Sequence, residues 1–182
     1  SRPIEEAFRD NAIPYKVIGA LKFFERAEIR DILGYMRFIA NHDDEVALSR
    51  IINNPKRGIG STTVMSLMEH AKSTNSSIYM AIKDYVRLNL AGNKITPYLE
   101  DFYNLIEKYK ELIFKPKNIS RTVQQLVDEI DYKGKLLSET KNIKSVENKM
   151  RNISQLIQSI YNYEKNPDNC EQNLNEYLQL IS

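Results

Sequence analysis

The sequence predicts a mainly α-helical protein. Apolar residues recur at spacings of three and four along most of its 182 residues, as in helices with one buried face. Only one short stretch has the composition of a β-strand. Hydrophobic residues make up 42% of the chain and charged residues 27%, which indicates a globular protein rather than a disordered one. We expect a helical body over residues 23–182, preceded by a helix and a strand within residues 1–22.

The N-terminal stretch predicts a helix followed by a strand. Pro3 suits the first turn of a helix over residues 2–10. The strand is predicted at residues 15–18 (YKVI), which are bounded by Pro14 and Gly19. A helix and a single strand cannot bury themselves. We therefore expect this stretch to belong to a sheet completed elsewhere, in a larger protein.

The next two helices lie before a proline. Ile29 and Leu33 belong to an apolar stripe over about residues 25–41. Residues 41–44 form a break with capping chemistry, and Pro55 ends the helix that follows because its ring fixes φ and removes a donor.

Further helices follow from the same kinds of signal. Their apolar stripes and boundaries place them at Val64 to Ala71, from Ser76 or Ser77 to about Leu90, Tyr98 to Ile113, Val123 to Ile130, residues 143–163 and residues 174–181. Ser120 is predicted to cap the fourth of these, and Gly134 interrupts a short helical turn after it. The aromatic residues at helical spacing are expected in the core.

Composition excludes several classes of function. The formal net charge is only +2, although residues 108–151 carry eleven Lys or Arg and six Asp or Glu. The single cysteine, Cys170, cannot form an internal disulfide and fits a reducing compartment. His42 and His70 have no metal-ligand spacing, so we expect no metal site. No apolar run is long enough for a membrane span, and we expect a soluble, cytoplasmic protein without a membrane partner.

Catalytic motifs are missing from the sequence. It has no GxxxxGK[ST] phosphate loop, no GxSxG elbow, no HExxH and no CxxC. The adjacent carboxylates Asp43 and Asp44 stand at a predicted helix start, where capping explains them better than acid–base catalysis. We expect no catalytic residues in this chain and no cofactor bound to it.

The most informative stretch is RIINNPKRGIGSTTV, residues 50–64. Two cations precede a glycine pair and a hydroxyl-rich helix start, in the order Lys56, Arg57, Gly58, Ile59, Gly60, Ser61, Thr62, Thr63. Glycines allow positive φ and close approach of a ligand to the backbone. Ser61 or Thr62 can cap the next helix, whose free N–H groups favour an anion. The local pattern fits a helix-hairpin-helix phosphate clamp or an ordinary turn between helices.

Three motifs together resemble one family. PY-x-V-x-G, FFERAEI-x-D and N-x-P-x-RGIG occur in this order within residues 1–64. The combination resembles the superfamily 1 DNA helicases of the UvrD/PcrA/Rep type. Beyond residue 64 the resemblance rests on helix pattern. At residues 149–156, KMRNISQL is similar to the R-x-E-N-L-x-E-L segment of the family, with Arg151 where an acid is usual.

The resemblance implies a domain organisation. Residues 1–22 are expected to be a remnant of the RecA-like domain 2A together with a hinge, and residues 23–182 the helical 2B subdomain. The end of helicase motif IV matches Ser1, Arg2 and Glu5. The hinge is expected at residues 19–24, with Gly19 absorbing the rotation and Phe23 and Phe24 anchoring the helical side.

The resemblance also implies a function. The parent would be an ATP-dependent 3′-to-5′ DNA helicase that uses ATP and Mg²⁺, and this chain would bind DNA and regulate unwinding. In the family the RGIG hairpin lies against the phosphates of the duplex ahead of the fork. Lys56 and Arg57 would supply charge, residues 58–60 amides, and residues 61–63 hydroxyl or amide contacts. The expected partners are a duplex–single-strand junction, the parent's motor domains, and repair proteins or a second copy. The alternative is a helical protein-interaction module without direct DNA contact.

Overall fold

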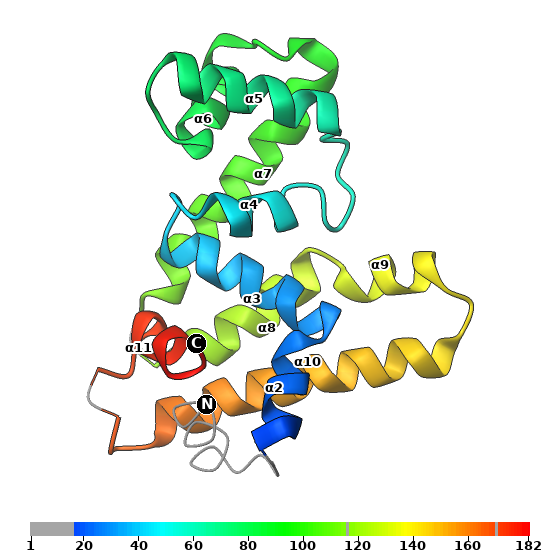
Figure 1. Ribbon diagram of the computed structural model, residues 1–182, viewed down its shortest axis with the longest axis vertical. Coiled ribbons are helices and arrows are strands. Elements are labelled where there is room, and N and C mark those ends of the chain that lie inside the picture. The colour runs from blue at the N-terminus through cyan, green and yellow to red at the C-terminus, as the bar shows by residue number, and fades with distance from the viewer. Residues whose placement is uncertain (1–16, 116, 170) are drawn as a thin grey trace.

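The computed structural model describes residues 17–115, 117–169 and 171–182, and within these ranges it contains helices and no strand (Figure 1). The helices are α2 (Val17–Glu25), α3 (Ala27–Ala40), α4 (Glu45–Ile51), α5 (Ser61–Ser73), α6 (Ile78–Leu88), α7 (Gly92–Ile113), α8 (Ile119–Glu129), α9 (Tyr132–Glu139), α10 (Ile143–Lys165) and α11 (Leu174–Leu180). The predicted mainly α-helical class is confirmed.

The strand predicted at residues 15–18 is wrong where it can be compared. Val17 and Ile18 lie in α2, and the other two residues lie outside the described ranges. A strand needs a neighbouring strand for its backbone hydrogen bonds, and the described residues offer none. A helix pairs the N–H and C=O groups of the same segment internally, which satisfies the backbone without a partner.

Helix α3 is the centre of the body. Ten of its fourteen residues are buried, including Ile29, Tyr35 and Met36, none of which is exposed. A helix that is buried on nearly all sides must be surrounded by others. It packs against α4, α7, α10 and α11, while α5 and α6 form a separate helical pair at the end of α7 (Figure 1).

The break between α2 and α3 lies at Arg26, which is extended at φ −63° and ψ 137°. The predicted hinge segment, residues 19–24, is therefore helical rather than a link between a strand and a helix. Its residues, Gly19 aside, form helices readily, and residue 26 supplies the change of direction instead. The proposed boundary after residue 22 falls inside α2, and the division into 1–22 and 23–182 stays a prediction.

A buried carboxylate joins three helices. Asp31 of α3 accepts hydrogen bonds from Arg50 Nε of α4 at 2.8 Å, and from Tyr132 Oη and Lys135 Nζ of α9 at 2.6 and 3.2 Å. Burial would raise the pKa of Asp31, but hydrogen bonds from Tyr132, Asn54 and Lys135 outweigh burial and hold its pKa below the ordinary value. The cluster fixes α9 beneath the loop that follows α4.

Helix α8 begins in an unexpected way. Its N-cap is Asn118, not the predicted Ser120. The buried carboxylate of Glu164, on α10, accepts hydrogen bonds from the amides of Ile119 and Ser120 at 3.0 and 2.8 Å. A distant acid therefore satisfies the first amides of α8, which favour negative charge.

Candidate nucleic-acid interface

Asn53, in the hairpin between α4 and α5, binds two backbone amides of the same hairpin. Asn53 Oδ1 accepts hydrogen bonds from the amides of Arg57 and Ile59, at 2.8 and 3.3 Å. Ile59 is only 1% exposed and packs into the core. The two amides that Asn53 binds are therefore used within the loop. The sequence predicted that the Ile59 amide would bind a ligand, but it is already paired with Asn53.

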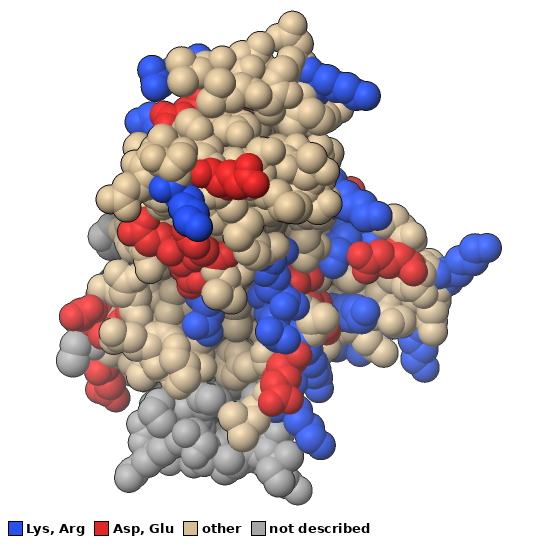
Figure 2. All heavy atoms as spheres, turned by 45° about the horizontal axis from the view of Figure 1, so that its top comes forward, with Lys and Arg blue, Asp and Glu red and all other residues tan. Residues whose placement is uncertain are grey.

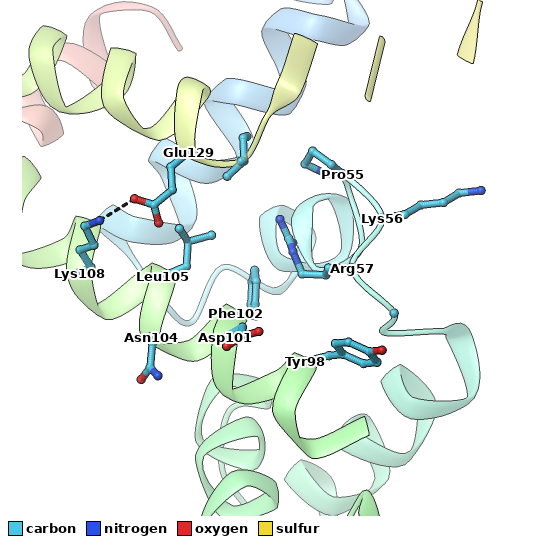
Figure 3. Close-up of a pocket in the computed structure, with 12 residues that line it drawn as sticks. Pro55, Lys56, Arg57, Tyr98, Asp101, Phe102, Asn104, Leu105, Lys108 and Glu129 are labelled. Carbon is cyan, nitrogen blue, oxygen red and sulfur yellow. Dashed lines mark hydrogen bonds and ion pairs between the residues drawn. The ribbon is translucent and has the colours of Figure 1, made fainter. Parts of the chain in front are cut away.

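Arg57 points into the protein (Figure 3). Its guanidinium donates to the carbonyl oxygens of Ile51 and Ile52 and to the hydroxyl of Tyr35, and it lies 4.9 Å from the centre of the Phe102 ring. The cation therefore ties the middle of the hairpin to the end of α4 and rests on an aromatic face. Its charge is directed to the loop itself.

Tyr35 extends this network from α3. Its hydroxyl donates to the carbonyl oxygen of Asn54 at 2.6 Å while accepting from Arg57. Burial raises the pKa of Tyr35 above its ordinary value, against the opposing effect of Arg57. The hydroxyl therefore keeps its proton at neutral pH and can serve as donor and acceptor together.

The two glycines of the hairpin differ in backbone conformation and in the space around them. Gly58 has φ +82°, and a Cβ on it would lie 2.7 Å from Cδ2 of Tyr98 on α7. Gly60 has φ −78°, which other residues adopt easily, and a Cβ there would meet nothing within 4 Å. Gly58 is thus required by conformation and by contact, whereas Gly60 leaves open space beside the start of α5.

The open side of the hairpin carries Lys56 and the start of α5. Lys56 is exposed and extends away from the loop (Figure 3). The N-cap of α5 is Gly60, which has no side chain to accept from the first amides. The predicted capping by Ser61 or Thr62 is wrong, because both lie inside the helix. The first-turn amides of residues 61–63 have no acceptor within the helix and can receive an anion.

Two clefts flank the hairpin. One, of about 730 Å³, lies between Lys56–Gly58 and α7 and reaches the end of α8 (Figure 3). Lys108 there is paired with Glu129 at 2.6 Å. Burial would raise the pKa of Glu129, but the Lys108 and Tyr109 hydrogen bonds hold it below the ordinary value. The other cleft, of about 680 Å³, separates Pro55 and Lys56 from α9. Lys56 therefore stands on a ridge with a hollow on each side.

The surface charge is mixed. On the face that Figure 2 shows, Lys and Arg gather toward the lower and right-hand parts, with Asp and Glu interspersed. No His, Cys, Asp and Glu group in the described part of the chain is arranged to hold a metal ion. None of the helices seen in the described ranges is both long and apolar enough to cross a membrane. Any anion recognition here must be local rather than the effect of a large single-sign field.

Comparison with known proteins decides the family. The profile of the UvrD-like helicase C-terminal domain matches residues 1–182. The chain belongs to this family. The UvrD-like chain is 34% identical over 183 residues to the ATP-dependent DNA helicase PcrA of Staphylococcus epidermidis (strain RP62A), and 33% identical over 184 residues to PcrA of Staphylococcus aureus (strain Mu50). All of the chain is matched in both comparisons, but it spans only 24% of the length of each relative.

The structure brings some of the predicted residues of this UvrD-like chain together. Lys56 to Thr63 form one hairpin and helix start, with Lys56 and Arg57 pointing in different directions. Phe23 is buried in the core, with its ring centre 5.3 Å from that of Phe24. The motif IV residues Ser1, Arg2 and Glu5 lie outside the described residues.

At Arg151 the resemblance predicted an acid, and the structure shows what the arginine contacts instead. Arg151 is exposed and donates to Asn148 Oδ1 at 3.1 Å on its own helix. The next residue, Asn152, makes the longer-range contacts, donating to Glu28 at 2.9 Å and accepting from Arg26 at 2.7 Å. These contacts join α10 to the break between α2 and α3.

The side chains that support the hairpin were not predicted to do so from the sequence. They are Tyr35, Asn53, Tyr98 and Phe102. Asn53 had a local signal, since an Asn two residues before a proline at a helix end often binds nearby backbone. The three aromatic residues had none, because each sits in an ordinary apolar stripe of a distant helix.

Proposed function

We propose that this chain is the 2B-type region of a UvrD-like helicase and that its hairpin binds the phosphates of duplex DNA beside a single-strand junction. The observation that carries the proposal is the exposed Lys56 beside the uncapped start of α5. A cation and free amides on one rigid support suit a phosphate group. Contacts of this kind position the protein without reading base sequence.

The residues of the hairpin take different roles in this proposal. Lys56 supplies charge, and the amides of Ser61, Thr62 and Thr63 donate to phosphate oxygens. Gly60 leaves room for the phosphate, since nothing lies within 4 Å of the place its Cβ would occupy. Arg57 acts as a positioning residue, because its guanidinium is occupied by the loop carbonyls and Tyr35.

The intact helicase would supply the motor. We assign ATP and Mg²⁺ to motor domains carried by the rest of the parent, and a cytoplasmic location to the whole protein. This chain's own residues do not fit a nucleotide site: the sequence lacks a phosphate loop, and its described residues form no metal-binding group. In the parent, binding of the duplex by the hairpin would set the orientation of the helical region at the junction and in this way regulate unwinding.

The test is anisotropy of a labelled duplex with a 3′ single-stranded tail, titrated between about 50 and 200 mM salt. Lys56→Ala should weaken binding by about five- to tenfold and lower the slope of log K against log salt by about 0.9. Lys83→Ala, an exposed lysine of α6, is the matched control and should leave both unchanged. Equal effects of the two variants would contradict the proposal.

A second pair of variants tests the amides. Ser61→Pro removes one first-turn N–H while keeping the helix, because proline is favoured at the first helical position. Gly60, at ψ 173°, already has the conformation that a following proline requires. Ser61→Ala removes the hydroxyl alone. We expect the proline variant to bind about three- to tenfold more weakly than the alanine variant. Identical affinities would leave the amides without a role.

A further inference from the structure

A groove separate from the hairpin crosses the surface of α2, α3 and α4. It encloses about 430 Å³ and shares no lining residue with the two clefts beside the hairpin. Its volume lies in the range of roughly 300–1,000 Å³ typical of ligand pockets. The groove is therefore large enough to accept one or two side chains of a partner.

A small residue on the groove, Gly34, lets α4 pack closely against α3. Arg30, Gly34 and Arg37 share one face of α3, because they are spaced by four and three residues. Helix α4 approaches closely at Gly34, where a Cβ would lie 3.0 Å from Cγ2 of Ile51. Arg30 and Arg37 stand on either side of Gly34 along α3 and border the groove.

The groove carries surplus positive charge. Arg30 and Arg37 have no carboxylate partner among the residues that the structure describes. Arg50 is paired with Asp31 at 2.8 Å. The carboxylate that lines the groove, Asp44, already accepts the Ala47 amide at 3.0 Å as the cap of α4. Two guanidinium groups are therefore available to an acidic ligand.

The groove is also apolar. Leu33 and Ala47 are buried and line it, Phe24 is half-buried, and Val46 is 84% exposed. An exposed valine beside two arginines can cover an apolar side chain of a ligand. A phosphate backbone brings no such side chain to bury, whereas a peptide does. The combination favours an acidic peptide with an apolar anchor over nucleic acid.

We propose that this groove docks an acidic segment of a partner protein. Carboxylates of the segment pair with Arg30 and Arg37, and an apolar side chain of the segment packs between Phe24 and Val46. Arginine is suited to this role because its planar fork binds a carboxylate with two parallel hydrogen bonds. The surface lies next to the α2–α3 break at Arg26, so a docked segment would contact both helices on either side of it.

The experiment measures binding of a labelled peptide, Asp-Glu-Leu-Asp-Glu-Phe-Asp-Glu, to the whole chain by anisotropy at low salt. A second peptide replaces its Leu and Phe by Ser, which keeps the charge and removes the anchors. We expect the first peptide to bind at least about tenfold more tightly than the second. Absence of binding by the first peptide, or equal binding of the two, would overturn the proposal.

Variants locate the site. Arg30→Ala with Arg37→Ala should weaken the first peptide by at least about tenfold. Val46→Ser should weaken the first peptide several-fold and leave the second unchanged. Lys83→Ala with Lys94→Ala, exposed cations elsewhere, is the matched control and should change nothing. Circular dichroism spectra should be the same for all, since Val46 and Arg30 are exposed.

The same variants separate this inference from the DNA-binding proposal. The arginine pair should leave the affinity for the tailed duplex unchanged, whereas Lys56→Ala should lower it and leave the peptide unaffected. If the arginine pair weakened the duplex as much as Lys56→Ala does and left the peptide unaffected, the groove would be a DNA surface and the partner-protein proposal would fail.

Discussion

Replacing Arg57 by alanine tests whether this residue supports the hairpin or binds DNA. The change removes hydrogen bonds to the carbonyls of Ile51 and Ile52 and to Tyr35, and it removes the contact with Phe102. Leaving a buried polar group without a partner costs about 1–3 kcal/mol, and the groups here share one network. We therefore expect a loss of about 3 kcal/mol in the free energy of unfolding.

Urea unfolding followed by circular dichroism measures this loss. With an m-value of about 2 kcal/mol/M, the midpoint should fall by about 1.5 M. Arg57→Lys should recover only part of the loss, because an ammonium cannot bind the loop carbonyls and the tyrosine in the same planar arrangement. Lys56→Ala, the exposed neighbour, should leave the midpoint within about 0.3 M of the parent chain.

The salt dependence of DNA binding completes the test. Arg57→Ala should leave the slope of log K against log salt close to that of the parent, since its charge does not face the ligand. Lys56→Ala should lower the slope by about 0.9. If Arg57→Ala instead kept the unfolding midpoint and lowered the slope by that same amount, Arg57 would be a phosphate ligand and not a support of the hairpin.

Three other changes have outcomes that follow from the structure. Gly58→Ala should lower the free energy of unfolding by about 2 kcal/mol, because alanine disfavours the positive φ and its Cβ would collide with Tyr98. Adding Tyr98→Ala should remove the collision but not the unfavourable φ, and urea unfolding of both variants would show the difference. Because the pKa of Asp31 is lowered in the folded state, the stability that its carboxylate contributes is present above about pH 4 and is lost as the pH falls through the folded-state pKa. Asp31→Asn should be about 3 kcal/mol less stable at pH 7, and its free energy of unfolding should fall less steeply on acidification. Glu164→Ala should lower the free energy of unfolding by about 2–3 kcal/mol, because the amides of Ile119 and Ser120 lose their acceptor. Asp168→Ala, in the exposed loop after α10, should leave the free energy of unfolding unchanged in the same urea experiment.

The helices could be predicted because their signals are local. The predicted helix over residues 143–163 corresponds to α10, which ends two residues later. The stripe containing Ile29 and Leu33 became α3. In each case the apolar spacing is set by the helix itself, so no distant residue was needed. The strand at residues 15–18 was wrong for the opposite reason, since a strand depends on a partner that the pattern cannot supply.

The hairpin was predictable as a turn but not in its contacts. Gly58 and Pro55 marked it, and Gly58 has the positive φ that the sequence indicated. The direction of Arg57 could not be predicted, because its aromatic support, Phe102, lies 45 residues further along the chain. Two adjacent cations look alike in a sequence, and only the packing of α3 and α7 around them distinguishes the buried one from the exposed one.

The way in which the hairpin is fastened has a mechanical consequence. Tyr35 attaches the loop to α3 and Phe102 supports it from α7, while Ile59 fills the core beneath it. A pull applied at Lys56 would therefore be carried into two long helices with little stretching of the loop. Because the hairpin is anchored in this way, a ligand bound to it and the helical body would move together, with little deformation of the loop between them.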